Sequence, residues 1–404
     1  MTPRSGPRGG PRPRDVFLVV NAADELGGAT AWAHTMAGLL AGRGHRVRLV
    51  GIAPAAPELR RPPSPSGPPP GYQVLTLHPR HPGTPWTPRR PLVAALLHPR
   101  RALGALRRRQ RRDAAVRRFD RLLAGAEPGG VVVNVQIWAM GWTSRTRRRG
   151  LHTIGMSHES YQATADSSRH ARVLSGYARS QVDRMLVLTR EDADAWITET
   201  GMNHVGAVPN PLPFPPPEER FRSSAKVVSA IGRIAPEKGL DQLLDAWSEL
   251  HESFPGWELR IHGSGSAAYT EELRRRAKAL RITSSVTFAG GTGDVPGVLA
   301  GTAVLALPSR AEGFPLTLLE AMSCGVPCVA FDVAPGIREI IEDGVDGLLA
   351  PPGDLPAFTD ALRRLMAGRE LRDRLGDKAF HSIRRYSPDA VLDQWERLFE
   401  LLDR

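Results

Sequence analysis

Two glutamates, Glu312 and Glu320, flank the start of a predicted helix and could bind hydroxyl groups there. They lie in the segment AEGFPLTLLEAMSCGVPCVAF, residues 311–331. The apolar run VLALPS before this segment predicts a buried strand, Pro315 is typical of a helix start and Gly325 of a helix end. Glu312 is therefore expected in a strand-to-helix loop, and Glu320 about 8 Å further along the helix axis.

The N-terminus of such a helix is a favourable place for phosphate, because its free N–H groups and its dipole attract anions. Carboxylates on either side of a bound diphosphate could then accept hydrogen bonds from sugar hydroxyl groups. The ligand shape that this arrangement favours is a pyrophosphate with a sugar on each side, as in a nucleotide sugar.

Two cations, Arg233 and Lys238, follow another predicted strand in the segment AIGRIAPEKGLDQLL. A helix is expected to begin near Gly239, so both cations lie between the carboxyl end of the strand and the helix. Together they could neutralise a diphosphate leaving group. The alternative is a pair of surface cations at a helix start, but the helix dipole disfavours positive charge there.

The elements that must position these residues alternate between strand and helix along most of the chain. Such alternation indicates parallel sheets covered by helices, with ligands beyond the carboxyl ends of the strands. The predicted strands are 15–21, 46–52, 73–77, 131–135, 151–156, 184–188, 226–232, 258–262, 286–289, 303–307 and 326–331. The predicted helices are 29–42, 100–124, 168–180, 190–200, 239–252, 267–281, 295–301, 315–323 and 388–402.

The 404 residues are enough for two domains. The Pro-rich run PNPLPFPPP, residues 209–217, predicts a linker between two doubly wound domains that face a cleft. We expect a disordered basic tail over 1–14, a first domain over 15–208 and a second over 209–387. A final helix within 388–404 could cross back to the first domain.

Charge is divided unevenly between the two halves of the chain. Residues 1–208 contain 31 Arg and 14 acidic residues, giving +17, and the remaining 23 Lys+Arg and 28 acidic residues give −5, which restores the net +12. The basic half suggests an anionic surface or partner. No uninterrupted apolar run of about 18 residues occurs, and the first residues lack an apolar leader, so we expect a cytoplasmic protein without a membrane-spanning helix.

The two cysteines, Cys324 and Cys328, exclude a disulfide framework and favour two small buried side chains over a zinc site. No D-x-D motif lies at a strand end, and no His/Asp cluster has the spacing of metal ligands. A metal-independent mechanism is therefore expected, with Arg233, Lys238 and helix dipoles supplying the positive charge.

The motifs GRIAPEKG and HGSG, the run from VTFAGG to CVAF, and GIREIIEDGVDGLLAPPGD resemble the retaining glycosyltransferases of family 4. The resemblance is close over 226–355 and loose in the first half. It implies the GT-B fold, two Rossmann-like domains with the active site between them. It also implies sugar transfer with retention at the anomeric carbon.

By this resemblance, Arg233 and Lys238 hold the donor pyrophosphate, Glu312 contacts the transferred sugar and Glu320 binds the ribose hydroxyls. The backbone of Gly313, Phe314 and Leu316 would lie against the sugar and phosphates. The resemblance also matches Gly27 and Gly28 to the first loop, and His158 to a histidine facing the reacting sugar.

Several loop residues remain open to more than one interpretation. Gly27–Gly28 is not a G-x-G-x-x-G motif and would be equally ordinary as a tight turn. A lone histidine such as His158 is more often a structural residue, and Glu159 could be an acceptor-side base or a solvated loop residue. Gly263, Ser264 and Gly265 form a turn suited to packing against the nucleotide, and Gly290–Thr292 would line the base pocket.

The Arg-rich segment 100–124, with RTRRR at 145–149, could lie on an anionic membrane surface. The lipid contact is assigned to residues 100–121. The alternative is a solvated helix whose apolar stripe is core. Nucleic acid is not expected, because aromatic residues make up only 6% of the chain and do not interleave with the arginines.

The predicted function is transfer of a sugar from a nucleotide sugar, most simply a UDP-sugar, to a glycan, lipid-linked or small-molecule acceptor. Two alternatives are a nucleotide-sugar epimerase of the same fold, which would need no acceptor, and a non-catalytic partner subunit that only binds nucleotide sugar.

Overall fold

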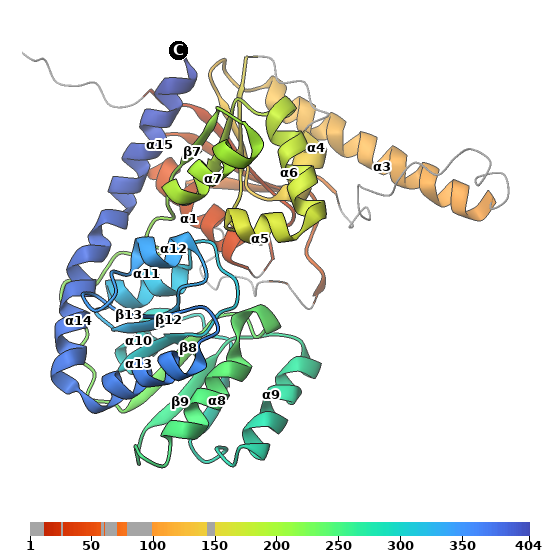
Figure 1. Ribbon diagram of the computed structural model, residues 1–404. Coiled ribbons are helices and arrows are strands. Elements are labelled where there is room, and N and C mark those ends of the chain that lie inside the picture. The colour runs from red at the N-terminus through yellow and green to blue at the C-terminus, as the bar shows by residue number, and fades with distance from the viewer. Residues whose placement is uncertain (1–11, 26, 58–59, 61–70, 79–98, 144–149) are drawn as a thin grey trace, which may run out of the picture.

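The computed structural model describes residues 12–25, 27–57, 60, 71–78, 99–143 and 150–404. Most of the predicted N-terminal tail, most of the Pro-rich loop before residue 71 and the RTRRR segment lie outside these ranges. The described chain forms two parallel α/β sheets, one above the other in Figure 1.

The first domain is built on a seven-stranded parallel sheet with the order β3-β2-β1-β4-β5-β6-β7. Its strands are β1 (Asp15–Val20), β2 (Arg46–Gly51), β3 (Tyr72–Thr76), β4 (Val131–Asn134), β5 (His152–Met156), β6 (Arg184–Val187) and β7 (Val205–Ala207). Its helices are α1 (Gly28–Gly42), α3 (Pro99–Ala124), α4 (Ile137–Thr143), α5 (Tyr161–Asp166), α6 (Ser168–Gln181) and α7 (Arg190–Thr200).

The second domain is built on a six-stranded parallel sheet with the order β10-β9-β8-β11-β12-β13. Its strands are β8 (Val227–Ile231), β9 (Glu258–His262), β10 (Val286–Gly290), β11 (Val304–Leu307), β12 (Cys328–Phe331) and β13 (Leu348–Ala350). Its helices are α8 (Leu240–Leu250), α9 (Ala267–Ala279), α10 (Val295–Ala300), α11 (Leu316–Ser323), α12 (Pro335–Ile340), α13 (Leu355–Ala367) and α14 (Arg369–Ser382).

Both sheets are doubly wound, as the sequence predicts. The strand order reverses between β1 and β4 in the first sheet and between β8 and β11 in the second. Ligands in such sheets bind beyond the carboxyl ends of the strands at the point of reversal. The loops after β1, β8 and β11 are therefore the ones expected to form a site, and the predicted site residues lie largely in them.

Continuous apolar runs form the strands because helices cover both faces of each sheet. All six residues of β1 and all four of β4, β11 and β12 are buried. Both cysteines are also buried and unbridged, and burial raises the pKa of the Cys324 thiol to about 11. They are core residues, the interpretation that the sequence favoured.

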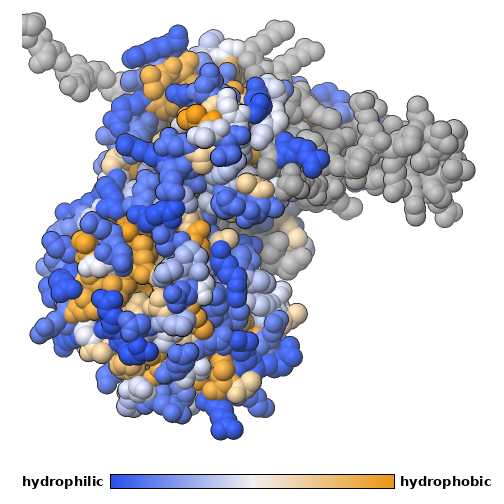
Figure 2. Space-filling model, viewed as in Figure 1, coloured by the Kyte–Doolittle hydropathy of each residue, from blue (hydrophilic) through white to orange (hydrophobic). Residues whose placement is uncertain are grey.

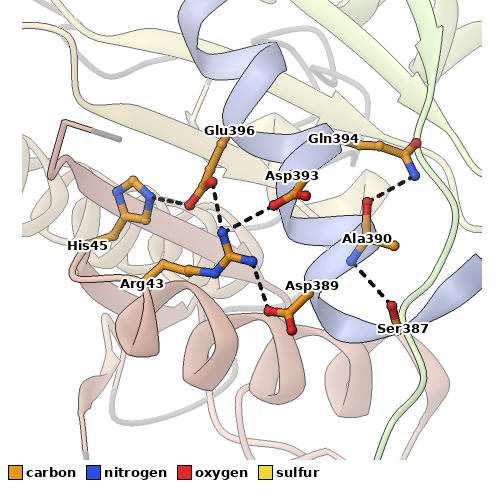
Figure 3. A network of polar contacts seen from close by, with 8 residues as sticks. All are labelled: Arg43, His45, Ser387, Asp389, Ala390, Asp393, Gln394 and Glu396. Carbon is orange, nitrogen blue, oxygen red and sulfur yellow. Dashed lines mark hydrogen bonds and ion pairs between the residues drawn. The ribbon is translucent and has the colours of Figure 1, made fainter. Parts of the chain in front are cut away.

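The final helix, α15 (Pro388–Leu402), lies against the first domain, while α14 lies along the second (Figure 1). Arg43, just after α1, donates to three carboxylates of α15 (Figure 3), and Arg14 pairs with Asp403. The carboxylates bound by Arg43 are Asp389, Asp393 and Glu396. The end of the chain is thus tied to the first domain by charge-assisted hydrogen bonds.

Helix α3 extends away from the first domain (Figure 1). The apolar stripe of its second half belongs to the core, since Ala115, Phe119 and Leu123 are at most 3% exposed. The side chains of Leu103 and Leu106, in the first half of α3, lie outside the described residues. Within the described part of the chain, no helix is long and apolar enough to cross a bilayer. The face in Figure 2 is mostly hydrophilic, with hydrophobic residues in separate patches.

Candidate functional site

Lys238 and Glu312 meet at the carboxyl edge of the second sheet. Lys238 follows β8 and Glu312 follows β11, and the Lys238 Nζ lies 2.7 Å from the Glu312 Oε1. The Ser309 hydroxyl donates to the same Oε1 at 2.6 Å. The Glu312 side chain is only 7% exposed, so these two donors fix its carboxylate in one orientation. A residue predicted for the pyrophosphate and one predicted for the sugar are thus direct neighbours.

Arg233 shares a pocket with Lys238 at this edge. The pocket is lined by the ends of β8, β9 and β11 and includes His262 and Ser309. Arg233 is largely exposed and pairs with Glu237 at 2.7 Å. Both predicted cations therefore border one recess beyond the carboxyl ends of neighbouring strands, where parallel α/β sheets bind their ligands.

Glu320 lies one turn inside α11 and differs sharply from Glu312. Its carboxylate makes no hydrogen bond within the described residues, and burial raises its pKa to about 7. A carboxylate in this state gains from any ligand that donates hydrogen bonds to it, because burial without partners penalises its charged form. A ribose with two hydroxyl groups is a ligand of that kind.

The glycine-rich turn after β9 packs its backbone against the loop that carries Arg233. A Cβ at Gly263 would lie 1.7 Å from the carbonyl oxygen of Gly232, and one at Gly265 would lie 1.9 Å from that of Ile234. These separations are far below van der Waals contact, so only glycine allows the two loops to approach. Gly263 also donates its N–H to Gly290 at the end of β10, which brings the predicted base loop, 290–292, alongside.

Gly313 is where the two domains touch within the site. It forms an antiparallel bridge with Glu159, which follows β5 of the first domain. A Cβ at Gly313 would lie 1.9 Å from the carbonyl oxygen of His158. A Cβ at Gly336, at the start of α12, would lie 2.0 Å from the carbonyl oxygen of Gly313 itself. Three backbone segments are therefore stacked here.

Phe314 and Leu316 belong to the segment predicted to face the sugar and phosphates. The Phe314 side chain is 3% exposed and packs edge-on against Tyr386, and its carbonyl oxygen accepts from the Asn210 side chain at 3.0 Å. Phe314 thus anchors the loop. Leu316 is the first residue of α11, so its N–H has no acceptor within the helix and is available to an anion.

His158 is brought to this junction from the first domain. No hydrogen bond involves either ring nitrogen within the described residues, and its Nε2 is buried. Burial lowers the pKa of His158 to about 4, so the ring is neutral near pH 7. A neutral imidazole offers one donor and one acceptor to a ligand without adding charge beside the cations.

Gly27 and Gly28 begin α1 across from the second domain. No described atom lies within 4 Å of a Cβ placed at either position, in contrast to the crowded glycines after β9 and β11. Two residues earlier, burial raises the pKa of the Glu25 carboxyl, and the nearby Arg233 guanidinium partly opposes that shift. The first loop therefore lies near Arg233 of the second domain.

Sequence reasoning missed Ser309, His262 and Asn210. Ser309 could have been found from its spacing, because S-x-x-E after a buried strand allows the hydroxyl to reach the glutamate. The Nε2 of His262 is buried without a hydrogen-bond partner and borders the pocket, which no local signal reveals. In the described residues, no group of three or more His, Cys, Asp or Glu could hold a metal ion.

Comparison with known proteins places the chain in a family. The sequence profile described as "Glycosyl transferases group 1" matches residues 215–382. An uncharacterized glycosyltransferase of Haemophilus influenzae is 30% identical over 239 residues, 59% of this chain and 67% of the relative. An exopolysaccharide phosphotransferase of Streptomyces coelicolor is 36% identical over 230 residues, but the chain spans only 24% of that relative.

Among solved structures, the chain is similar to Anabaena HepE crystallised in complex with UDP and glucose. The TM-score is 0.74 at 18% identity, over 96% of this chain and 99% of HepE. At this identity the likeness concerns the fold, and it covers both domains in their observed arrangement. The chain belongs to the group 1 glycosyltransferases of GT-B fold, because it matches their sequence profile and these relatives, and because it has two doubly wound domains and the paired Lys238 and Glu312.

Proposed function

We propose that the protein transfers a sugar from a nucleotide sugar to an acceptor hydroxyl group, with retention of anomeric configuration and without a metal ion. The observation that carries this proposal is the contact between Lys238 and Glu312 at 2.7 Å, beside the N-terminus of α11. It brings a cation for a phosphate and a carboxylate for a sugar hydroxyl to adjacent positions.

The remaining site residues fit the parts of such a donor. Arg233 and Lys238 neutralise the diphosphate, with the free N–H groups at the start of α11 as further donors. Glu312 accepts from a hydroxyl of the transferred sugar while Ser309 and Lys238 orient it. Glu320 accepts from the ribose hydroxyls.

The proposed transfer step uses these contacts. The bond between the anomeric carbon and the phosphate oxygen breaks, and its electron pair stays on the phosphate. The acceptor oxygen forms its bond to the anomeric carbon on the same face, and the acceptor proton passes to the departing phosphate oxygen. His158, which is neutral at pH 7, donates a hydrogen bond to the sugar or accepts one from it.

UDP is the proposed nucleotide and a glycan, lipid-linked or small-molecule hydroxyl the proposed acceptor. The UDP and glucose in the HepE complex support a UDP-sugar. The name of the Streptomyces relative, an exopolysaccharide phosphotransferase, supports a glycan acceptor.

The test is a thermal-shift panel of UDP-, GDP- and ADP-sugars, followed by turnover with the sugar that stabilises the protein. A ligand at 100 times its Kd adds about 2.7 kcal/mol to the free energy of unfolding. NMR of the product then determines the anomeric configuration of the new linkage. An inverted anomeric centre would refute retention, and loss of activity in EDTA, restored by a divalent cation, would refute the metal-free step. Epimerised donor in the absence of acceptor would show an epimerase instead.

Site variants separate catalysis from binding alone. Lys238→Ala and Glu312→Ala should each lower kcat/KM by about 100- to 1000-fold, the usual effect of removing a charge-stabilising group. Arg276→Ala is the matched control, because it breaks an ion pair with Asp245 of 2.6 Å on the outer helices of the same domain. Turnover that survives both site variants would contradict the assignment.

We also propose that the exposed arginines of α3 bind an anionic membrane at its cytoplasmic face. The apolar stripe of the second half of α3 is core, so this contact would be electrostatic, at about 1 kcal/mol per arginine near the surface. Sedimentation with phosphatidylglycerol vesicles should show binding that high salt abolishes. Absence of salt-sensitive binding would refute it. The exposed arginines described are Arg107, Arg111, Arg117, Arg118 and Arg121.

A further inference from the structure

Two tryptophans connect the C-terminal helix to the active-site histidine. Trp32 of α1 is 2% exposed, and its ring lies 5.0 Å from that of His158 at an interplanar angle of 68°. The Trp32 ring also lies 5.9 Å from that of Trp395 in α15. Residues far apart in the sequence thus form one continuous line of aromatic contacts that ends at the site.

The ring of His158 needs support from packing. The terminal torsion of a histidine is broad and roughly two-fold, and within the described residues no hydrogen bond holds either ring nitrogen. The ring orientation is therefore set by the groups that pack against it. An edge-on aromatic contact contributes about 0.5–1.5 kcal/mol beyond burial, enough to favour one orientation several-fold.

Trp395 is itself firmly held. It is 1% exposed and contacts Phe399 at 5.9 Å on the same helix. The carboxylates of α15 are bound by Arg43, next to the end of α1 (Figure 3). Movement of α15 relative to α1 would therefore disturb the contact between Trp395 and Trp32.

We propose that Trp32 is a positioning residue that fixes the ring of His158 toward the reacting sugar, and that Trp395 supports Trp32. Through these contacts the C-terminal helix acts on the active site without touching substrate. This inference rests on the proposed function of His158, and goes beyond it by assigning roles to two residues that bind no ligand.

A matched control exists in the same domain. Trp142 at the end of α4 contacts His78 at 5.2 Å and 67°, nearly the geometry of Trp32 and His158, and is 4% exposed. It belongs to the core cluster on β1, β2, β4 and α3, separate from the cluster that holds Trp32. Its removal should cost comparable packing energy without reaching His158.

The experiment compares Trp32→Leu, Trp395→Leu and Trp142→Leu with wild type. Three quantities are measured: donor affinity, kcat, and the titration of His158 by NMR, whose signal is identified by its loss in His158→Gln. Trp32→Leu should lower kcat about tenfold, leave donor affinity within about twofold, and raise the pKa of His158 toward its ordinary value. Trp395→Leu should act in the same direction and lower kcat about threefold. Trp142→Leu should change none of the three quantities.

The conservative variant Trp32→Phe should restore most of kcat, and Trp395→Leu, compared with Trp142→Leu, carries the test if Trp32→Leu fails to fold. The inference is overturned if Trp32→Leu, or Trp395→Leu where Trp32→Leu does not fold, matches the Trp142→Leu control while His158→Gln abolishes turnover. If wild type turns over no nucleotide sugar, the proposed function fails. The NMR titration of His158 then still decides whether Trp32 controls that ring.

Discussion

The glycines in the loops after β9 and β11 and those in the loop after β1 have opposite surroundings. In the second domain, Cβ atoms at Gly265 and Gly313 would each lie 1.9 Å from a backbone oxygen. In the first domain, no described atom lies within 4 Å of a Cβ at Gly27 or Gly28. The loops after β9 and β11 are therefore packed closely against neighbouring backbone, whereas the first loop has open space.

This difference suggests a division of labour between the domains. Close backbone packing holds charged groups such as Lys238 and Glu312 in a fixed geometry, which favours charge stabilisation without reorganisation. An open first loop leaves room for an acceptor. Substitutions at the packed glycines of the second domain should therefore affect folding and binding together, and those at the glycines of the first loop should affect only transfer.

The largest effect is expected for Gly313→Ala. The new Cβ would lie 1.9 Å from the His158 carbonyl, so the two domains must separate locally, at a cost of about 3 kcal/mol or more in the free energy of unfolding. Urea denaturation measures this, and donor turnover should fall as well. A variant as stable and active as wild type would show that the junction is loose.

Glu320→Gln should change how stability depends on pH. The folded pKa of about 7 lies above the ordinary value of 4.5, so the folded state binds the proton more tightly. Below pH 4.5, Glu320 therefore contributes about 3 kcal/mol to the free energy of unfolding. This contribution is lost as the pH rises from 4.5 to about 7.

Glu320→Gln should lack this decline in stability with pH. His158 titrates in the same range and changes stability in the opposite direction. Subtracting the stability curve of the variant from that of wild type therefore isolates the contribution of Glu320. Parallel curves for wild type and Glu320→Gln would show that Glu320 is hydrated in solution. Nucleotide affinity should fall in the variant, because the amide is a weaker acceptor for ribose hydroxyls.

Arg233→Ala should separate binding from stability. The side chain is 62% exposed and its pair with Glu237 is at the surface, so the free energy of unfolding should change by less than about 1 kcal/mol. Calorimetry should nevertheless show nucleoside diphosphate affinity reduced by about tenfold or more, since a charge facing the diphosphate is lost. Unchanged affinity would place the diphosphate elsewhere.

The smallest stability effect is expected for Gly28→Ala. The position begins α1 and has free space around it, so stability should change by less than about 0.5 kcal/mol. Turnover with acceptor should fall if the backbone there must approach a ligand, while donor affinity stays unchanged. A loss of stability like that of Gly313→Ala would remove the contrast between the packed loops of the second domain and the first loop.

Most long elements could be predicted because their apolar periodicity is local. The helix expected over 190–200 is α7 with the same bounds, and the strand expected over 258–262 is β9. Short elements were not predicted, among them β7, β13 and α12, which contain three, three and six residues. Segments this short acquire their structure from the sheet edge or loop they pack against, so periodicity carries little signal.

The candidate site shows the same limit. Residue types around 233–238 and 312–320 indicated phosphate and hydroxyl binding, because strand ends and helix starts are readable within a few residues. The sequence could not indicate that the amine of Lys238 binds the carboxylate of Glu312, which is 74 residues away. It also could not indicate that only one of the two glutamates is left without a partner.

The sequence by itself determined two parallel α/β domains, the loops that carry the charged residues, and the basic character of the first half. Tertiary structure alone decided which side chains meet: Gly313 against the His158 carbonyl, and Trp32 against the His158 ring. The reason is physical. Strand and helix boundaries depend on neighbours along the chain, whereas contacts between distant segments depend on how whole sheets and helices pack.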